Sequence, residues 1–207
     1  MSPSPINPTV FSKAFSLLNV QCINYTDLAR LVAREEEENQ MTAPPPAIAV
    51  AHVGLTVPDL GAAMDWYMKA LGLQELDIRL EFHATDSPEL ENAFATLYDG
   101  RCTGIRMGFL LAGGATVIEV FEFEGVEYRR PEEPLAFDRG GIWHFGFQVV
   151  DIEAALDWIE ALGGERQSEV LVAFPDRPYR YAYFTDPWGN LVELQTHGLI
   201  QMFANQG

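Results

Sequence analysis

The chain contains the stretch HVGLTVPDLGAAMDW, from His52 to Trp66, and repeats it as HFGFQVVDIEAALDW, from His144 to Trp158. The two copies lie 92 residues apart and are identical at eight of fifteen positions, which include the opening histidine and the glycine two residues later. An internal repeat indicates that one structural unit is used twice. A repeat that only maintained packing would have no need to keep a histidine in register, so the repeat also points to a functional site.

Each copy predicts a β-strand that runs directly into an α-helix. After each histidine, apolar residues alternate with others, which is the period of a strand and sorts the residues onto two faces. The apolar set must cover a core, so we expect both histidines on the opposite face, beside a glycine that keeps this face open. Asp59 and Asp151 stand where N-caps belong, and Gly72 and Gly163-Gly164 stand where the helices end.

Three further strand-like segments follow each predicted helix. They are residues 76–82, 104–111 and 116–123 in the first copy, and 169–173, 179–185 and 191–197 in the second. The tetrad Asp186-Pro187-Trp188-Gly189 has the proline and glycine placement of a β-turn, which predicts a hairpin between the last two strands. The sequence therefore predicts a βαβββ unit used twice, with an extra segment near 84–101 in the first copy.

The paired units, the histidine that opens each first strand and the ending DPWGNLVEL, residues 186–194, resemble the vicinal oxygen chelate superfamily. Within it, the bacterial type of glyoxalase I is the most similar pattern. The resemblance covers roughly Ala51–His197 and implies an α+β fold, in which two βαβββ modules form a cupped, half-open mixed β-barrel with helices outside. It divides the domain 48–207 into module one (51–123), a linker (124–141) and module two (142–197).

In that superfamily, each module contributes one metal ligand from its first strand and one from its last strand. The resemblance therefore implies that His52, Glu119, His144 and Glu193 hold one divalent metal ion. Two imidazoles and two carboxylates suit Ni, Co, Zn, Mn or Fe, and they leave positions open for water or substrate oxygens. The sequence leaves open which metal is used and whether a second chain completes the cup.

Glu122 is a competing register for Glu119, because a slip of the strand would exchange its two faces. Glu119 is favoured because it follows the turn residue Gly114 at nearly the same spacing at which Glu193 follows Gly189.

The resemblance implies a glyoxalase-like isomerase, lyase or epimerase that chelates a small oxygenated metabolite and moves a proton next to the chelated carbonyl. Glu119 and Glu193 are the candidate catalytic carboxylates. Arg106 and Gln148 are candidate substrate-binding residues; an ion pair of Arg106 with Asp77, Glu81 or Glu122 is the alternative. Two other functions remain open: an iron-dependent dioxygenase, against which a fourth ligand counts, and a metal-free binding or resistance protein, against which the whole ligand set counts.

The formal net charge of −17 limits the kinds of partner that the protein can bind. Such a charge repels phosphate backbones and anionic lipids, so we expect a small-molecule substrate and neither nucleic acid nor membrane as partner. The two cysteines, Cys22 and Cys102, form no disulfide framework, and no apolar run is long enough to span a bilayer. We therefore expect a cytoplasmic protein, and the resemblance implies a homodimer. Residues 1–47 are expected to form an extension with helices at 11–19 and 26–39, followed by a proline-rich linker.

Overall fold

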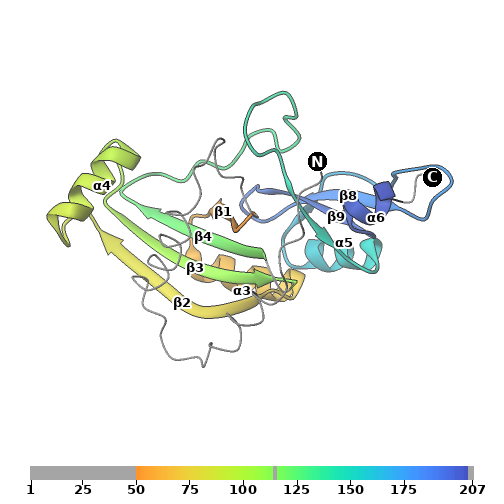
Figure 1. The fold of residues 1–207 in the computed structure, drawn as a ribbon, viewed down its shortest axis with the longest axis horizontal. Helices are drawn as coiled ribbons and strands as arrows, with labels where there is room; N and C mark the ends of the chain where they lie inside the picture. The colour runs from red at the N-terminus through yellow and green to blue at the C-terminus, as the bar shows by residue number, and fades with distance from the viewer. Residues whose placement is uncertain (1–49, 114–115, 205–207) are drawn as a thin grey trace, which may run out of the picture. The chain divides into compact units, whose positions relative to one another are not determined.

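The computed structural model describes residues 50–113 and 116–204. Within these ranges lie two β-sheets with helices packed against them, so the expected α+β fold of two modules is confirmed (Figure 1). The N-terminal extension 1–47, with its expected helices, lies outside the described residues. No helix within the described ranges is long and apolar enough to cross a membrane.

Module one forms a sheet of four strands with its first and last strands side by side. The strands run in the spatial order β1-β4-β3-β2, with β1 and β4 parallel and the other pairs antiparallel. This arrangement places the expected ligand of the first strand next to the expected ligand of the last strand. The elements are β1 (His52–Thr56), α3 (Leu60–Leu71), β2 (Gln74–His83), α4 (Pro88–Tyr98), β3 (Gly104–Ala112) and β4 (Thr116–Glu124).

Module two repeats this topology with shorter strands. The first strand, β5, is again parallel to the last, β9, in the order β5-β9-β8-β6. The strand expected at 169–173 is reduced to the short strand β7, and a short strand that we did not expect, β6, precedes it; both pair with β8. The elements are β5 (Phe145–Gln148), α5 (Ile152–Ala161), β6 (Glu165–Arg166), β7 (Leu171–Val172), β8 (Arg180–Thr185), β9 (Leu191–Gln195) and α6 (Leu199–Ala204).

The repeated helices begin at the caps that the sequence predicts. The Asp59 carboxylate accepts a hydrogen bond from the backbone N–H of Ala62 at 2.9 Å, and Asp151 accepts one from Ala154 at 3.1 Å. Each bond satisfies one of the free donors of a first helical turn. Helix α3 ends at Gly72, whose φ of 66° lies in the left-handed region that glycine adopts without a steric penalty.

The two modules share one hydrophobic core and exchange equivalent hydrogen bonds. The indole N–H of Trp66 donates to the carbonyl of Leu162 at 2.9 Å, and that of Trp158 donates to the carbonyl of Lys69 at 3.0 Å. Each repeat tryptophan thus binds the end of the other module's helix, which explains why both copies keep it. The shared core includes the buried side chains of Leu55, Val57, Met64, Leu110, Ile118 and Val120 from module one and Leu156, Ile159, Phe184, Val192 and Leu194 from module two.

Helix α4 is an element that we did not predict, and it lies in the extra segment of module one. It begins after the N-cap Ser87, with Pro88 in its first turn, and its Phe94 is buried. A second, smaller core forms where α4 covers one end of the first sheet. Its buried members are Phe94, Cys102 and Ile105, and the half-buried side chains packed against them include Phe82, Met107, Phe121 and Phe123.

Candidate metal centre

In module one, the sheet register brings His52 and Glu119 together. Gly54 on β1 is paired with Glu119 on β4, and His52 lies two residues before Gly54 on the same face. The apolar partners Leu55 and Val57 point to the opposite, buried face. As a result, Nε2 of His52 lies 3.4 Å from Oε2 of Glu119, with the imidazole more than half exposed.

Module two builds the same pair at the equivalent positions. Gly146 on β5 is paired with Glu193 on β9, and Nε2 of His144 lies 3.1 Å from Oε2 of Glu193. A Cβ at position 146 would lie 3.6 Å from Oε2 of Glu193, so this glycine is directly next to the carboxylate. The repeat in the sequence therefore corresponds to a repeated His–Glu pair in space.

Glu122 faces the other side of the first sheet. Its Oε2 accepts a hydrogen bond from the backbone N–H of Leu60 at 2.7 Å, at the N-terminus of α3. Its Oε1 accepts a short hydrogen bond from the guanidinium of Arg106. A buried carboxylate at a helix N-terminus is stabilised by the free backbone donors there. The register therefore places Glu119, and not Glu122, beside His52.

Arg106 lies on the helix-facing side of β3, which corrects our expectation that it faces the cup. The reason is the close approach of α3: a Cβ at Gly108, on the same face as Arg106, would lie 2.9 Å from Sδ of Met64 and 3.4 Å from Cδ1 of Leu60. Gly108 and the buried Leu110 therefore face α3, and Arg106 shares their face. Arg106 forms the ion pair with Glu122 that we had weighed as its alternative.

Aromatic side chains surround the imidazole of module two. The ring of Trp143 lies 4.7 Å from that of His144, and the ring of Tyr183 lies 5.3 Å from it. Burial, followed by the negative charge of Glu193, raises the pKa of Tyr183 to about 12, so its hydroxyl stays protonated at neutral pH. Neither Tyr183 nor Trp143 is among the site residues that we expected from the sequence. Trp143 directly precedes His144 in the sequence, and this position is the signal that could have identified it as a site residue.

Gln148, the second substrate-binding candidate, shares the face of Gly146. Its amide nitrogen donates a hydrogen bond to the carbonyl of Thr196 at 3.3 Å, and its side chain is exposed. It lines a cavity of about 530 Å³ with residues of both modules, including Val53 and Gly146.

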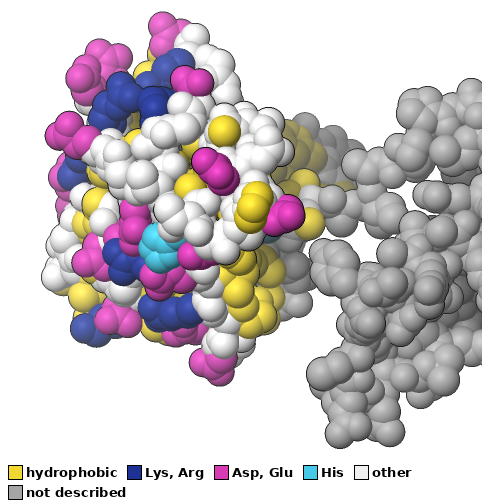
Figure 2. All heavy atoms as spheres, turned by 90° about the vertical axis from the view of Figure 1, so that its left-hand side faces the viewer, with side chains coloured by type: hydrophobic (Ala, Val, Ile, Leu, Met, Phe, Trp, Pro, Cys, Tyr) yellow, Lys and Arg dark blue, Asp and Glu magenta, His cyan; other side chains and the backbone are white. Residues whose placement is uncertain are grey.

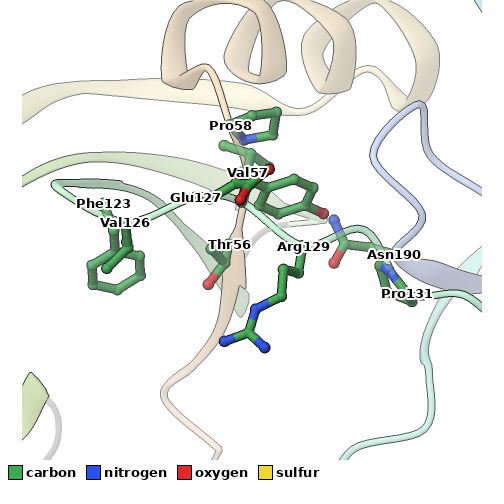
Figure 3. A pocket seen from close by; sticks show the side chains of 10 residues that line it. Thr56, Val57, Pro58, Phe123, Val126, Glu127, Arg129, Pro131 and Asn190 are labelled. Carbon is green, nitrogen blue, oxygen red and sulfur yellow. The ribbon is translucent and has the colours of Figure 1, made fainter. Parts of the chain in front are cut away.

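A second cavity, of about 400 Å³, lies at the end of β1 (Figure 3). Thr56 and Phe123 line it, and these residues share the face of His52 and Glu119. Figure 3 shows the guanidinium of Arg129 beside the strand that carries Thr56. Arg129 forms no ion pair with any residue in the described ranges, so this cation is available where Arg106 is not.

The sequence profile of the Glyoxalase/Bleomycin resistance protein/Dioxygenase superfamily matches residues 49–194. The chain belongs to this superfamily. It is 32% identical over 155 residues to a 2-epi-5-epi-valiolone epimerase from an Actinomyces species, a match that covers 72% of this chain and 80% of that one. It also resembles the structure of a glyoxalase family protein from Bacillus cereus, with a TM-score of 0.60 and 19% identity over 75% of this chain and 97% of the other. At that identity the structural likeness shows the fold alone.

The donor atoms of each His–Glu pair have a separation that suits a shared metal ion. Ligand atoms about 2.1 Å from a divalent ion lie roughly 3.0 Å apart at a right angle and roughly 3.4 Å apart at a tetrahedral angle. The observed separations are 3.4 Å and 3.1 Å, and no hydrogen bond joins either imidazole to its carboxylate in the described part of the chain. Each pair can therefore supply two neighbouring ligands.

The two pairs do not meet within one chain. Among the described residues, no three of His52, Glu119, His144 and Glu193 have donor atoms within 4.8 Å of one another. Each pair belongs to its own sheet, and strand pairing fixes ligands only within a sheet. Within a single chain the structure shows two separate His–Glu pairs, and the convergence of all four residues stays a prediction.

Proposed function

We propose that this protein is a metal-dependent epimerase or isomerase that moves a proton next to a chelated carbonyl. The observation that carries the proposal is the His–Glu pair that occurs at the same place in both modules. The similarity to an enzyme named as an epimerase supports this branch of the superfamily over ring cleavage or sequestration. We take 2-epi-5-epi-valiolone, or a ketone like it, as the substrate to be tested first.

The residues of the chain divide the chemistry between them. A divalent ion held by the two histidines and two glutamates would act as a Lewis acid on the substrate carbonyl. One carboxylate, Glu119 or Glu193, removes the proton from the neighbouring carbon, and the other, protonated, returns a proton to the opposite face. The configuration at that carbon is inverted and no atom is gained or lost. The neutral hydroxyl of Tyr183 can donate a hydrogen bond to a substrate oxygen.

We further propose that a second copy of the chain completes the metal centre. Each His–Glu pair offers two protein ligands, while a catalytic metal usually has three or more. A symmetric dimer can bring module one of one copy to module two of the other, and the same operation forms a second, identical site.

Arg129 is the cation that we assign to the substrate in place of Arg106. It lines the cavity beyond the His52–Glu119 pair, where Thr56 adds a hydroxyl. Thr56 lies two residues beyond Gly54, which is paired with Glu119, so the cavity begins about 7 Å along the strand from that carboxylate. A ring-sized polyhydroxylated substrate spans this distance.

The test is solvent hydrogen exchange. The protein is stripped of metal, reloaded with Ni, Co, Zn, Mn or Fe, and incubated with 2-epi-5-epi-valiolone in deuterated water. We expect deuterium at the carbon next to the carbonyl, together with the epimer, detected by nuclear magnetic resonance. Loss of a general base typically costs 100-fold or more, so Glu119→Gln and Glu193→Gln are expected to reduce the exchange rate at least about that much.

Glu169→Gln is the matched control, because Glu169 is an exposed carboxylate outside the strands. It is expected to exchange at the wild-type rate. No exchange above the metal-free background with any metal, in protein that remains folded, would refute the proposal and favour a binding protein. Oxygen uptake with iron would instead support a dioxygenase.

A further inference from the structure

A second group of metal-binding side chains lies on the opposite face of the first sheet from the His52–Glu119 pair. Strand β3 places Gly104 between His83 on β2 and Glu124 on β4, because both are its register partners. Glu81 lies two residues before His83 and therefore shares its face. Figure 2 shows acidic and basic side chains gathered around a histidine on the face it presents.

The side chains of His83 and Glu124 meet across the middle strand because residue 104 has no side chain. Their backbones are two strand spacings, or about 10 Å, apart. A Cβ at position 104 would lie 2.7 Å from Oε2 of Glu124 and 2.8 Å from Cδ2 of His83. These contacts are too short for any other residue to be accommodated without displacing both ligands. The glycine therefore creates the space in which the two functional groups converge.

The donor distances in this group suit an ion better than direct hydrogen bonds. Nε2 of His83 lies 3.4 Å from Oε2 of Glu124 and 3.6 Å from Oε1 of Glu81. Charge-assisted hydrogen bonds are roughly 2.7–2.9 Å long, and no hydrogen bond joins this imidazole to a carboxylate in the described part of the chain. The three donor atoms all lie within 4.8 Å of one another, as the ligands of one divalent ion do. We propose that His83, Glu81 and Glu124 bind a divalent transition metal at a site separate from the candidate catalytic centre.

Neighbouring groups orient these ligands. Oδ2 of Asp86 accepts a hydrogen bond from the backbone N–H of His83 at 2.7 Å and lies 3.8 Å from Nδ1 of its ring. At 3.8 Å this carboxylate is not hydrogen-bonded to the ring, but it lies on the Nδ1 side, and Nε2 is the ring nitrogen nearest Glu81 and Glu124. Nε of Arg106 lies 3.4 Å from Oε1 of Glu124, the oxygen that the site does not use.

The charge of the group also favours a cation. The His83 ring lies near the carboxylates of Glu81, Asp86 and Glu124. The one guanidinium of the group, that of Arg106, pairs with Glu122 and Glu124. One imidazole with two carboxylates prefers zinc, manganese, cobalt or nickel over calcium and magnesium, which favour all-oxygen sites. Because the ligands come from β2 and β4, the ion would tie the edge strand of the sheet to its interior. The site is therefore structural, and it does not depend on the proposed reaction.

The experiment uses a full-length background variant, His52→Ala/His144→Ala, which lacks the histidines of the catalytic centre. Zinc binding is measured by equilibrium dialysis and by the rise in melting temperature. We expect about one equivalent of zinc to remain bound in the background, and to be lost when His83→Ala is added. His197→Ala is the matched control, and it should retain the equivalent.

Gly104→Ala provides a second, steric route to the same result, because it keeps all three ligands but fills the space between them. It should also abolish the zinc equivalent and the zinc-dependent rise in melting temperature. Circular dichroism identifies any variant that fails to fold, and Glu81→Gln then replaces it. A background variant that binds no zinc, or whose zinc is unaffected by both His83→Ala and Gly104→Ala, would overturn the proposal. Neither outcome bears on the epimerase proposal, because the background variant lacks the two histidines of the candidate catalytic centre.

Discussion

Asp186 is a buried carboxylate that connects the two modules. It accepts hydrogen bonds from the hydroxyl of Tyr67 at 2.7 Å, from the backbone N–H of Trp188 at 3.0 Å, and from the backbone N–H and side-chain amide of Asn190, each at 2.8 Å. Burial raises the pKa of this carboxyl, and the four donors oppose the rise. Because Tyr67 belongs to α3 and the other donors belong to the turn before β9, one residue fixes the turn against the first module.

Replacing Asp186 with alanine is expected to destabilise the protein on the order of 3 kcal/mol. The change leaves the buried hydroxyl of Tyr67 and two donors of Asn190 without their acceptor, and each unsatisfied buried group costs about 1–3 kcal/mol. Urea unfolding measures the loss. Asp65→Ala, at an exposed position of α3, is the control and should change stability by no more than about 0.5 kcal/mol. Equal effects of the two changes would contradict the assigned role.

Tyr128 makes stability depend on alkaline pH. Burial, followed by the charge of Asp186, raises its pKa to about 12, although Arg130 opposes the rise. An unfolded tyrosine titrates near about 10, so the folded state favours the neutral form. This contribution is fully present below about pH 10 and is lost as the pH rises through about 12.

Tyr128→Phe is therefore expected to flatten the loss of stability between pH 8 and pH 11. At pH 8 the variant should be about 1 kcal/mol less stable, because the hydroxyl no longer donates its 2.7 Å hydrogen bond to the carbonyl of Trp188. Urea unfolding at both pH values gives the comparison. If wild type and variant lose the same free energy of unfolding between pH 8 and pH 11, a group other than Tyr128 is responsible for the loss.

At the scale of elements, local signals predicted the repeat well and the faces of β3 poorly. Alternation, N-caps and terminal glycines act within a few residues, so they defined β1, α3, β5 and α5. In β3, both faces carry apolar side chains, and the choice between them depends on what packs against each. Helix α4 covers the open side near Ile105, while α3 presses on Gly108. Local signals do not show which helix packs against which face of β3. For this reason the sequence predicted neither α4 nor the correct face for Arg106.

The sequence also contained a signal for α4. Ser87 followed by Pro88 is a typical helix start, and Phe94 and Tyr98, four residues apart, pack ring against ring at 5.6 Å. The closeness of each histidine to a glutamate could be expected, because the repeat and the family resemblance both point to equivalent positions in the two modules. The separation of the two pairs could not, because it depends on how whole sheets are placed.

Glu122 is expected to stabilise the junction between β4 and α3. Glu122→Gln should reduce stability by about 1–2 kcal/mol, because it removes the charge that serves both the N-terminus of α3 and the guanidinium of Arg106. We set the loss below that of a fully buried pair because Arg106 is 43% exposed. Glu119→Gln, on the other face of the same strand, is the matched control. In the presence of a chelator it should have a smaller effect; a larger one would contradict the assigned faces.

For the whole molecule, the property on which the proposed metal centre depends is that each chain carries two His–Glu pairs, one in each sheet. Strand pairing places His52 beside Glu119 and His144 beside Glu193. The shared core and the paired tryptophan hydrogen bonds hold the two modules to each other through their helices. Since α3 and α5 occupy that junction, the proposed dimer would use the parts of the opposite sheet faces that carry His52 and His144.

Mixing two inactive variants tests this arrangement. His52→Ala and His144→Ala each damage both sites of a homodimer that pairs module one of one copy with module two of the other. In a heterodimer of the two variants, one site carries both lesions and the other carries none. Random pairing after joint refolding makes half of the dimers mixed, so roughly a quarter of all sites should be intact. We expect metal content and exchange activity to recover to about that fraction, while each variant refolded alone stays inactive. Sites formed within one chain would give no recovery, because every chain in the mixture lacks one histidine.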